Sequence, residues 1–434
     1  MSMGRFSALK WLYPGMRVKR WLLLATLGVL LITGGGLGAA LVANMVVFDL
    51  LGDINNYSRL HFGLPVTALV VPIGLVLIGL GMVCLALGIR GLVRSVASVL
   101  DPYGNQRLAE VVYRKRYLQQ GSNIVVVGGG TGLSTMIRGL KEFTSNITAV
   151  VTVSDDGGSS GRLQQEMGIL PPGDIRNCLV ALADDEAVMG EIFQHRFNGA
   201  VSSLSGHSLG NLILAGMTQL RGGDFERAVK EVARVLAIRG SVLPSTVDRV
   251  TIHADMADGT HIKGESSIGR SHGPVMRIGL EPEHPRPVGD VLAAIAAADL
   301  IVLGPGSVFT SVIPNLLIPE IAEAIARADA LKVHICNVMT QPGETDGFKA
   351  SDHVEAIIRH AGRRVFDYVL VNNRTPRRDL LAKYEVHGQT MVEPDVEKIR
   401  RMGFECIVGD FISETDLVRH DPQKLARAIA RLVE

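Results

Sequence analysis

The sequence predicts an α/β protein: a doubly wound, mostly parallel Rossmann-like sheet with a small antiparallel insertion, preceded by two transmembrane helices. Two long stretches near the N-terminus lack any charged residue, which indicates the membrane helices. From residue 123 onward, short apolar runs alternate with helix-like segments, as in βαβ units. One segment of alternating residues with a central Asp-Gly pair breaks this pattern. We therefore expect a transmembrane hairpin (1–92), a linker (93–121) and an α/β domain (122–434).

The uncharged stretches, 22–48 and 64–89, each exceed the ~20 residues that a helix needs to cross a bilayer. Basic residues precede the first stretch and follow the second, whereas the connection holds a single Arg. This bias predicts a multi-pass protein of the cell membrane with both termini and the α/β domain on the cytoplasmic side. Gly34 and Gly38 form a small-xxx-small pair that seats the two helices together or drives dimerisation. In the linker, residues 113–117 form either an amphipathic helix beside anionic headgroups or a solvated connecting helix.

Composition excludes several other classes of protein. A formal net charge of +1 gives no basic field for nucleic acid, and 5% aromatic residues give no stacking platform for single strands. The four cysteines lie at scattered positions, which predicts no disulfide framework and suits a reducing compartment. His253 and His261 are candidate cross-strand neighbours without a third ligand, so no zinc site is predicted.

Apolar runs predict six strands of the main sheet: 124–127, 147–153, 300–303, 333–336, 368–371 and 405–408. Helix-like patterns lie between and around them: 133–143, 191–197, 209–220, 225–237, 288–297, 318–328, 353–360 and 424–433. The last helix has its own start signal, with Asp421 as N-cap and Pro422 at the first position. Residues 242–280, with Asp258-Gly259 between two alternating runs, predict an antiparallel insertion built on a hairpin.

The most informative segment is the glycine-rich loop after the first strand of the sheet, residues 128–132. A buried strand that feeds a glycine turn and a helix N-terminus lets backbone N–H groups approach a phosphate, whose charge the helix dipole favours. Leu133 replaces the last glycine of G-x-G-x-x-G, so a tight turn without a ligand is the alternative. Two further loops, 303–307 and 337–345, follow neighbouring strands. Because parallel strands end at one edge, we expect the three loops to converge on a nucleotide-binding crevice.

Carboxylates and a guanidinium follow at the same predicted edge. Asp155 and Asp156 follow the second apolar run; adjacent residues on a strand face opposite sides, so one points at a ligand and the other caps the next turn. Asp174 and Arg176 come just before a helix. Arg176 either binds a phosphate or carboxylate, or forms an ion pair with Asp174 that orders the loop. Hard Asp oxygens together with phosphate oxygens would suit Mg²⁺.

Residues 206–210 match G-x-S-x-G, the nucleophile elbow of serine hydrolases. That elbow needs an apolar strand immediately before it, yet the segment 198–205 is short and polar. A helix start explains the segment better, with His207 and Asn211 one turn apart and facing the crevice.

These loops, in this order, resemble the 2-phospho-L-lactate transferase/gluconeogenesis-factor family (CofD/YvcK-like). The segments that carry the resemblance are GGGTGLS (128–134), SDDGGSSGR (154–162), PPGDIRN (171–177), GHSLGN (206–211), GPGS (304–307) and CNVMTQPGET (336–345). The residues of these segments are more similar to those of the YvcK branch, whose members bind UDP-sugars and are needed for growth on gluconeogenic carbon sources and for normal cell shape. The transferase branch moves a phospholactyl group from a nucleotide diphosphate onto a deazaflavin, with magnesium.

The resemblance implies a domain that holds a UDP-sugar or another nucleotide diphosphate, with Mg²⁺ as a candidate companion ligated by Asp155 and Asp174. The implied binding residues are Gly129, Gly130, Thr131, Gly132, Asp155, Asp156, Gly158, Ser159, Asp174, Arg176, Asn177, His207, Asn211, Gly304, Gly306, Ser307 and Asn337. The membrane hairpin departs from the family, whose members are usually soluble.

Two functional hypotheses follow. The first is a membrane-tethered cytoplasmic UDP-sugar-binding regulator that links carbon metabolism to envelope synthesis through an unidentified protein partner, with homo-oligomerisation left open. The second is an enzyme that moves a phosphoryl-linked group from a nucleotide diphosphate adduct, using backbone amides, Arg176 and magnesium to stabilise negative charge. A nicotinamide oxidoreductase is disfavoured, because no recognisable hydride-acceptor constellation accompanies the glycine loop.

Overall fold

The computed structural model describes residues 19–44, 52–100, 117–198, 203–271, 273–414 and 417–433. The chain forms two compact units, 1–113 and 114–434. The part of the predicted linker helix at 113–116 lies outside the described residues.

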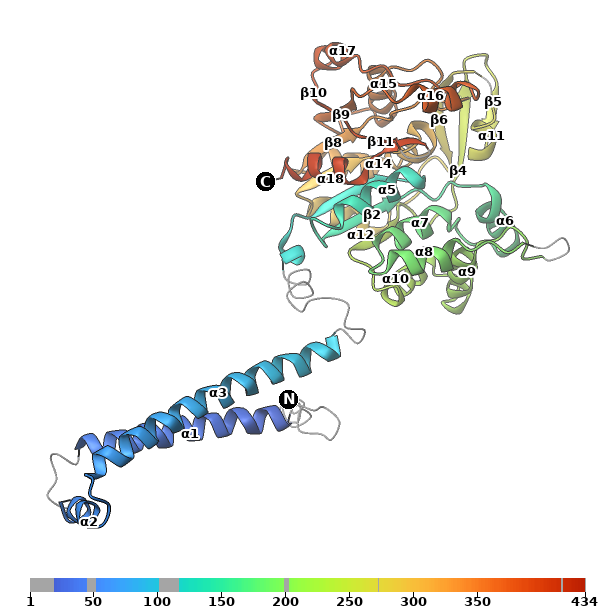
Figure 1. The fold of residues 1–434 in the computed structure, drawn as a ribbon. Coiled ribbons are helices and arrows are strands. Elements are labelled where there is room, and N and C mark those ends of the chain that lie inside the picture. Colours follow the sequence, from blue (N-terminus) through green and yellow to red (C-terminus); the bar gives the residue numbers. More distant parts are fainter. Residues whose placement is uncertain are drawn as a thin grey trace. The chain divides into compact units, whose positions relative to one another are not determined.

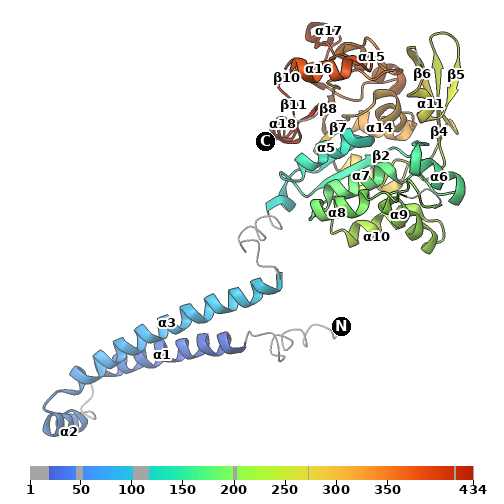
Figure 2. The same cartoon turned by 45° about the vertical axis from the view of Figure 1, so that its right-hand side comes forward.

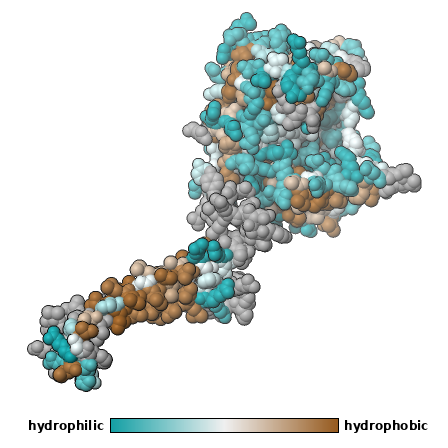
Figure 3. Space-filling model, viewed as in Figure 1, coloured by the Kyte–Doolittle hydropathy of each residue, from teal (hydrophilic) through white to brown (hydrophobic). Residues whose placement is uncertain are grey.

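The N-terminal unit is a hairpin of two long helices, α1 (Lys19–Asn44) and α3 (Val66–Leu100), with the short α2 (Gly52–Phe62) between them (Figure 1). Large apolar side chains stand exposed on both long helices, among them Leu23 and Leu30 on α1 and Leu75 and Val76 on α3. Figure 3 shows an apolar surface along the visible face of the hairpin. Two segments, Lys19–Gly38 and Val70–Ser95, are long and apolar enough to cross a membrane.

Glycines spaced seven residues apart bring α1 and α3 together. A Cβ atom built on Gly28 would lie 2.7 Å from the carbonyl oxygen of Gly81, and one built on Gly35 would lie 2.6 Å from the carbonyl oxygen of Gly74. Both contacts are too short for any side chain, so the two backbones touch where these glycines meet. The spacing keeps the glycines on one face of each helix, which fixes the register of the hairpin.

The predicted glycine pair of α1 lies away from this contact. A Cβ atom on Gly34 would meet no described neighbour within 4 Å, and one on Gly38 would meet only a methyl carbon of Val70 at 3.8 Å. The prediction that this pair seats the two helices together is therefore wrong, because the helix register turns Gly28 and Gly35 toward α3 instead.

Replacing Gly81 with Leu is expected to separate α1 from α3, because the new side chain would collide with the backbone of Gly28. The matched control is Gly79→Leu, since a Cβ atom on Gly79 meets nothing within 4 Å. In detergent micelles, we expect Gly81→Leu to make the hairpin accessible to protease while Gly79→Leu leaves it protected. Equal protection of both variants would contradict this packing.

The second unit is built on a parallel sheet of seven strands in the order β10-β9-β8-β7-β1-β2-β3. Its strands are β1 (Ile124–Gly128), β2 (Ile147–Val151), β3 (Ser241–Pro244), β7 (Leu300–Leu303), β8 (Leu331–Ile335), β9 (Tyr368–Asn372) and β10 (Glu405–Gly409). Every neighbouring pair is parallel. All residues of β1 and β7 are buried, as expected for strands covered by helices on both faces (Figures 1 and 2). The predicted doubly wound fold and its six strands are confirmed, each strand to within two residues.

Helices connect the strands and cover the sheet. They are α5 (Gly130–Leu140), α6 (Gly158–Met167), α7 (Gly173–Leu182), α8 (Glu186–Gln194), α9 (Leu209–Leu220), α10 (Phe225–Val235), α12 (Gly289–Ala296), α13 (Ile313–Leu316), α14 (Pro319–Arg327), α15 (Ala350–Ala361), α16 (Arg378–Glu385), α17 (Val396–Arg401) and α18 (Pro422–Ala430). The predicted start of α18 is confirmed, because the Asp421 carboxylate accepts hydrogen bonds from the backbone N–H groups of Gln423 and Lys424, both at 2.9 Å. The predicted helix at 191–197 begins earlier, where Asp185 caps α8.

The insertion is a three-stranded antiparallel sheet in the order β5-β4-β6, with the short helix α11 (Glu265–Ile268) beside it. Its strands are β4 (Thr251–Met256), β5 (His261–Lys263) and β6 (Val275–Glu281). The Asp-Gly hairpin is confirmed: Gly259 has a φ of +85°, and Asp258 accepts a hydrogen bond from Thr260 N at 2.9 Å. The rings of His253 and His261 lie 5.0 Å apart across it.

The predicted start of the insertion at residue 242 is wrong. Residues Ser241–Pro244 form β3, the edge strand of the main sheet, and pair in parallel with β2. The strand is short and ends in Pro244, which suits an edge because proline cannot donate a hydrogen bond to a further strand.

Candidate functional site

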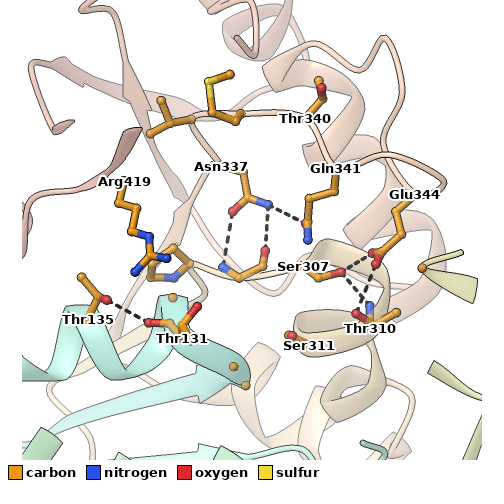
Figure 4. Close-up of a pocket in the computed structure, with 18 of the residues that line it drawn as sticks. Thr131, Thr135, Ser307, Thr310, Ser311, Asn337, Thr340, Gln341, Glu344 and Arg419 are labelled. Carbon is orange, nitrogen blue, oxygen red and sulfur yellow. Dashed lines mark hydrogen bonds between the residues drawn. The ribbon is translucent and has the colours of Figure 1, made fainter. Parts of the chain in front are cut away.

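The candidate site lies between β1 and β7, where the strand order of the sheet reverses. From β1 the chain continues outward through β2 and β3, and from β7 it continues through β8, β9 and β10 in the other direction. Beyond the loops that follow β1 and β7, the chain therefore runs in opposite directions along the sheet, which opens a crevice at its carboxyl edge. A cavity of ≈ 470 Å³ occupies this position, a size typical of small-molecule sites (Figure 4).

The glycine loop after β1 forms a tight strand-to-helix turn at the N-terminus of α5. Gly129 is the N-cap of α5, and Gly130 has a φ of +66°, a conformation that side chains other than glycine rarely adopt. A Cβ atom on Gly132 would lie 2.6 Å from the carbonyl oxygen of Pro305, so only glycine lets the β1 and β7 loops meet. Leu133, which replaces the last glycine of the motif, is fully buried in the core.

Asn337 clamps the loop that follows β7. Its amide donates to the carbonyl oxygen of Gly306 at 2.8 Å and accepts from the N–H of Gly306 at 3.3 Å (Figure 4). Ser307 caps the next helical turn by accepting from Thr310 N at 3.2 Å, and it donates its hydroxyl proton to Glu344. Both predicted site residues thus lie in the cavity wall and hold it in shape.

A hairpin near the C-terminus supplies a cation that the sequence analysis missed. Strands β11 (Ile412–Glu414) and β12 (Val418–His420) pack on a small apolar cluster of Val338, Met339, Leu380, Ile412 and Val418. This packing places Arg419 in the cavity wall, where Figure 4 shows its guanidinium near Thr131 and Thr135 of α5. No motif surrounds Arg419, so only the fold reveals its position.

Carboxylates gather at another part of the cavity. Asp155, Glu265 and Glu344 line it, and Asp174 lies behind the glycine loop, where its Oδ2 would be 2.7 Å from a Cβ atom on Gly129. Burial and the charge of Asp155 raise the pKa of Asp174 to about 6. Burial, together with the charges of Asp155, Asp174 and Glu344, raises the pKa of Glu265 to about 9. Burial also raises the pKa of Glu344. The sequence analysis missed Glu265, because it stands on α11 of the insertion, outside every motif.

The pair Asp155 and Asp156 behaves as predicted in one respect: only Asp155 lines the cavity. Asp155 also accepts a hydrogen bond from Gly157 N at 2.9 Å, so it caps its own turn. Asp156 instead accepts from Ser266 N at 2.8 Å and ties the insertion to this loop.

Several predicted binding residues form a buried polar network. Arg176 donates to Ser208 Oγ at 2.5 Å, to Asn211 Oδ1 at 3.1 Å and to Asn177 Oδ1 at 2.8 Å. Ser159 Oγ bonds to the ring of His207 at 2.9 Å and accepts from Asn211 at 3.0 Å. The alternative in which Arg176 pairs with Asp174 is wrong within the described residues, since the guanidinium donates to neutral oxygens.

The structure therefore divides the predicted site residues into two sets. Those that line the cavity are Gly129, Gly130, Thr131, Gly132, Asp155, Gly306, Ser307 and Asn337. Those that do not line it are Asp156, Gly158, Ser159, Asp174, Arg176, Asn177, His207, Asn211 and Gly304. The expectation that His207 and Asn211 face the crevice is wrong, because both bond to Ser159 in the buried network.

Ser208 is not a nucleophile of the hydrolase type. Residues 203–206 form turns instead of a strand, and Ser208 is the N-cap of α9, accepting from Asn211 N at 3.3 Å. The predicted helix start is confirmed, and the strand-turn-helix geometry of a nucleophile elbow is missing from this described segment.

Magnesium fits this site only together with a ligand. Within the described ranges, no group of three or more His, Cys, Asp or Glu side chains could hold a metal ion. Mg²⁺ commonly uses one or two carboxylates and completes its shell with water and phosphate oxygens. Asp155 raises the pKa of Asp174, so the two carboxylates share a negative field that a cation would offset.

A parallel sheet that reverses its order beside a glycine-walled polar cavity defines a Rossmann-like fold with a candidate ligand site at its switch point. The family model described as 2-phospho-L-lactate transferase CofD matches residues 124–412. The chain belongs to this CofD family.

Relatives of the chain carry one common name. A Bacillus subtilis protein named "Gluconeogenesis factor" is 48% identical over 73% of this chain and 99% of its own length. A Nostoc sp. relative, which carries the gluconeogenesis-factor name provisionally, is 45% identical over 97% of this chain and 92% of its own, so that match includes the N-terminal unit. A crystal structure of a Bacillus halodurans protein, 49% identical with a TM-score of 0.69, covers 71% of this chain and 99% of that one.

Proposed function

We propose that the protein is a regulator that binds a nucleoside diphosphate sugar, such as a UDP-sugar, in gluconeogenic metabolism and cell-shape maintenance. The observation that carries the proposal is the cavity at the switch point, where the glycine loop opens α5 and the Arg419 guanidinium lies near Thr131 of that loop. Backbone N–H groups at a helix N-terminus bind phosphate oxygens, and a guanidinium adds charge-assisted hydrogen bonds. The shared name of the relatives supports the metabolic role.

We further propose that the hairpin tethers this domain to the cell membrane with both termini in the cytoplasm. Its two apolar helices and the basic residues that flank them support this orientation. A tether would hold the domain at the membrane, where an unidentified protein partner in envelope synthesis would recognise its ligand-bound state.

A second candidate function is transfer of a phosphoryl-linked group from a nucleotide diphosphate adduct. The match to the transferase model and the paired carboxylates Asp155 and Asp174 favour it. In the transferase these two carboxylates would hold Mg²⁺, which would neutralise charge on the diphosphate when bound.

A thermal-shift screen of residues 117–434 with UDP-sugars, GDP, GTP and NAD tests the proposal. The solved relative lacks a counterpart of the N-terminal unit, which supports folding of this fragment alone. A ligand at a hundredfold excess over its Kd should add about 2.7 kcal/mol of stability. Stabilisation by a UDP-sugar that is recovered unchanged supports the regulator, and conversion to product supports the transferase. Stabilisation by NAD alone would contradict both the regulator and the transferase hypothesis.

Arg419→Ala is expected to raise the Kd of a UDP-sugar about tenfold, the loss of one charge-assisted hydrogen bond. The control is Arg363→Ala, which removes an exposed arginine that does not line the cavity. Isothermal titration of both variants gives the comparison. Equal Kd values for the two would remove Arg419 from the site.

A further inference from the structure

The cavity has two ends of opposite electrostatic character. Figure 4 shows Arg419 and Glu344 on opposite sides of Asn337, with the glycine-loop residue Thr131 at the Arg419 side. Asp155 and Glu265 also line the cavity. The charges of Asp155 and Glu344 both act on Glu265. A ligand with a diphosphate at the basic end therefore reaches its other end into a wall of carboxylates.

Glu265 is the member of this wall without a partner. Its Oε2 atom is buried and forms no hydrogen bond with any described residue. Glu344, in contrast, accepts from the hydroxyls of Ser307 and Thr310. A buried polar atom without a partner destabilises the folded state, so an unpaired oxygen in a cavity wall indicates a partner supplied by a ligand.

The helix that carries Glu265 is firmly seated beside the cavity. Ser266 N donates to Asp156 at 2.8 Å, which fixes α11 to the loop after β2. Gly264, with a φ of +92°, lets the chain pass so close to Asp156 that a Cβ atom would overlap the carboxylate. The backbone position of Glu265 is thus set by the fold before any ligand arrives.

The surrounding charge determines which groups this end can accept. Burial raises the pKa of Glu265 to about 9, with the charges of Asp155, Asp174 and Glu344 adding to the shift, so Glu265 carries its proton at neutral pH. The same field opposes any further negative charge. A protonated carboxyl can both donate to and accept from a hydroxyl group.

We propose, on the basis of the proposed nucleotide-sugar function, that Glu265 hydrogen-bonds a hydroxyl of the sugar and that its end of the cavity admits neutral, hydroxyl-bearing groups and rejects anionic ones. Rejection by unpaired like charge is a usual source of ligand specificity. A donor whose tail carries a carboxylate, such as a phospholactyl group, would be excluded by this wall, whereas a neutral hexose would be held.

The test compares UDP, UDP-glucose and UDP-glucuronate by isothermal titration with the full-length chain in detergent, once with Mg²⁺ and once with EDTA. The wild type is expected to bind UDP-glucose about tenfold more tightly than UDP-glucuronate. Glu265→Leu should weaken UDP-glucose about tenfold and leave UDP unchanged, because only the sugar loses its partner. Glu265→Gln, which keeps a neutral donor and acceptor, should bind UDP-glucose within about threefold of the wild type. Glu283→Gln, an exposed carboxylate of the same segment, is the control.

Equal affinity of the wild type for UDP-glucose and UDP-glucuronate would overturn the inference, as would an unchanged ratio of UDP-glucose to UDP affinity in Glu265→Leu. Both results leave the proposed function standing. Failure of UDP and UDP-glucose alike to bind the wild type would overturn the proposed function and this inference with it.

Discussion

Replacing Gly130 with Val is expected to abolish binding of a nucleotide diphosphate, with a loss of affinity of about a hundredfold or more. Gly130 has a φ of +66° at the start of α5 and lines the cavity. A β-branched residue there costs on the order of 1–3 kcal/mol in backbone strain and would rotate the N–H groups away from the phosphate. Its methyl groups would also occupy the space that a phosphate needs.

The matched control is Gly158→Val, measured in the same titration. Gly158 also has a positive φ, +47°, but a Cβ atom there meets nothing within 4 Å and the residue does not line the cavity. Both variants carry backbone strain, so only the position relative to the ligand differs. We expect Gly158→Val to stay within about threefold of the wild type. Equal losses in the two variants would show that strain alone, and not the phosphate site, explains the first result.

The main sheet was predictable because its strands are covered on both faces. Such strands are continuous apolar runs, as in 300–303, where every residue is buried. Strand β3 escaped this rule, since Ser241 is exposed and Pro244 ends the strand at the sheet edge. The Asp258-Gly259 turn was equally visible, because its backbone conformation demands those residues locally.

The cavity was only half predictable, and the reason is distance along the chain. The glycine loop and Asn337 follow strands directly, so strand order alone places them together. Glu265 lies on the insertion and Arg419 on the C-terminal hairpin, and no local sequence pattern links either segment to the sheet edge. Sequence also cannot show that a polar residue such as Arg176 already donates hydrogen bonds to its neighbours Ser208 and Asn211.

His334 on β8 is expected to make the α/β domain lose stability in acid. Its ring is fully buried, its Nδ1 donates to Leu303 O at 3.2 Å, and its Nε2 has no partner among the described residues. Burial lowers the pKa of His334 from 6.5 to about 3. Below pH 6.5 the unfolded chain therefore binds a proton that the folded chain refuses. Stability falls as the pH drops, by about 2 kcal/mol for this residue between pH 7.5 and 5.

Glu265 contributes with the opposite sign over the same interval: burial raises its pKa from 4.5 to about 9, so the stability it contributes is present below pH 4.5 and is lost progressively as the pH rises from there to 9. Urea unfolding of the wild type and of His334→Asn at pH 7.5 and pH 5 isolates the histidine, since Asn keeps a donor for Leu303 O but cannot be protonated. The smaller side chain should lower stability at both pH values, yet the change in stability from pH 7.5 to pH 5 should be about 2 kcal/mol more favourable than in the wild type. His387→Asn, which replaces an exposed histidine, should keep the wild-type pH dependence. Parallel pH profiles for wild type and His334→Asn would show that His334 accepts a proton in the folded state as readily as in the unfolded one.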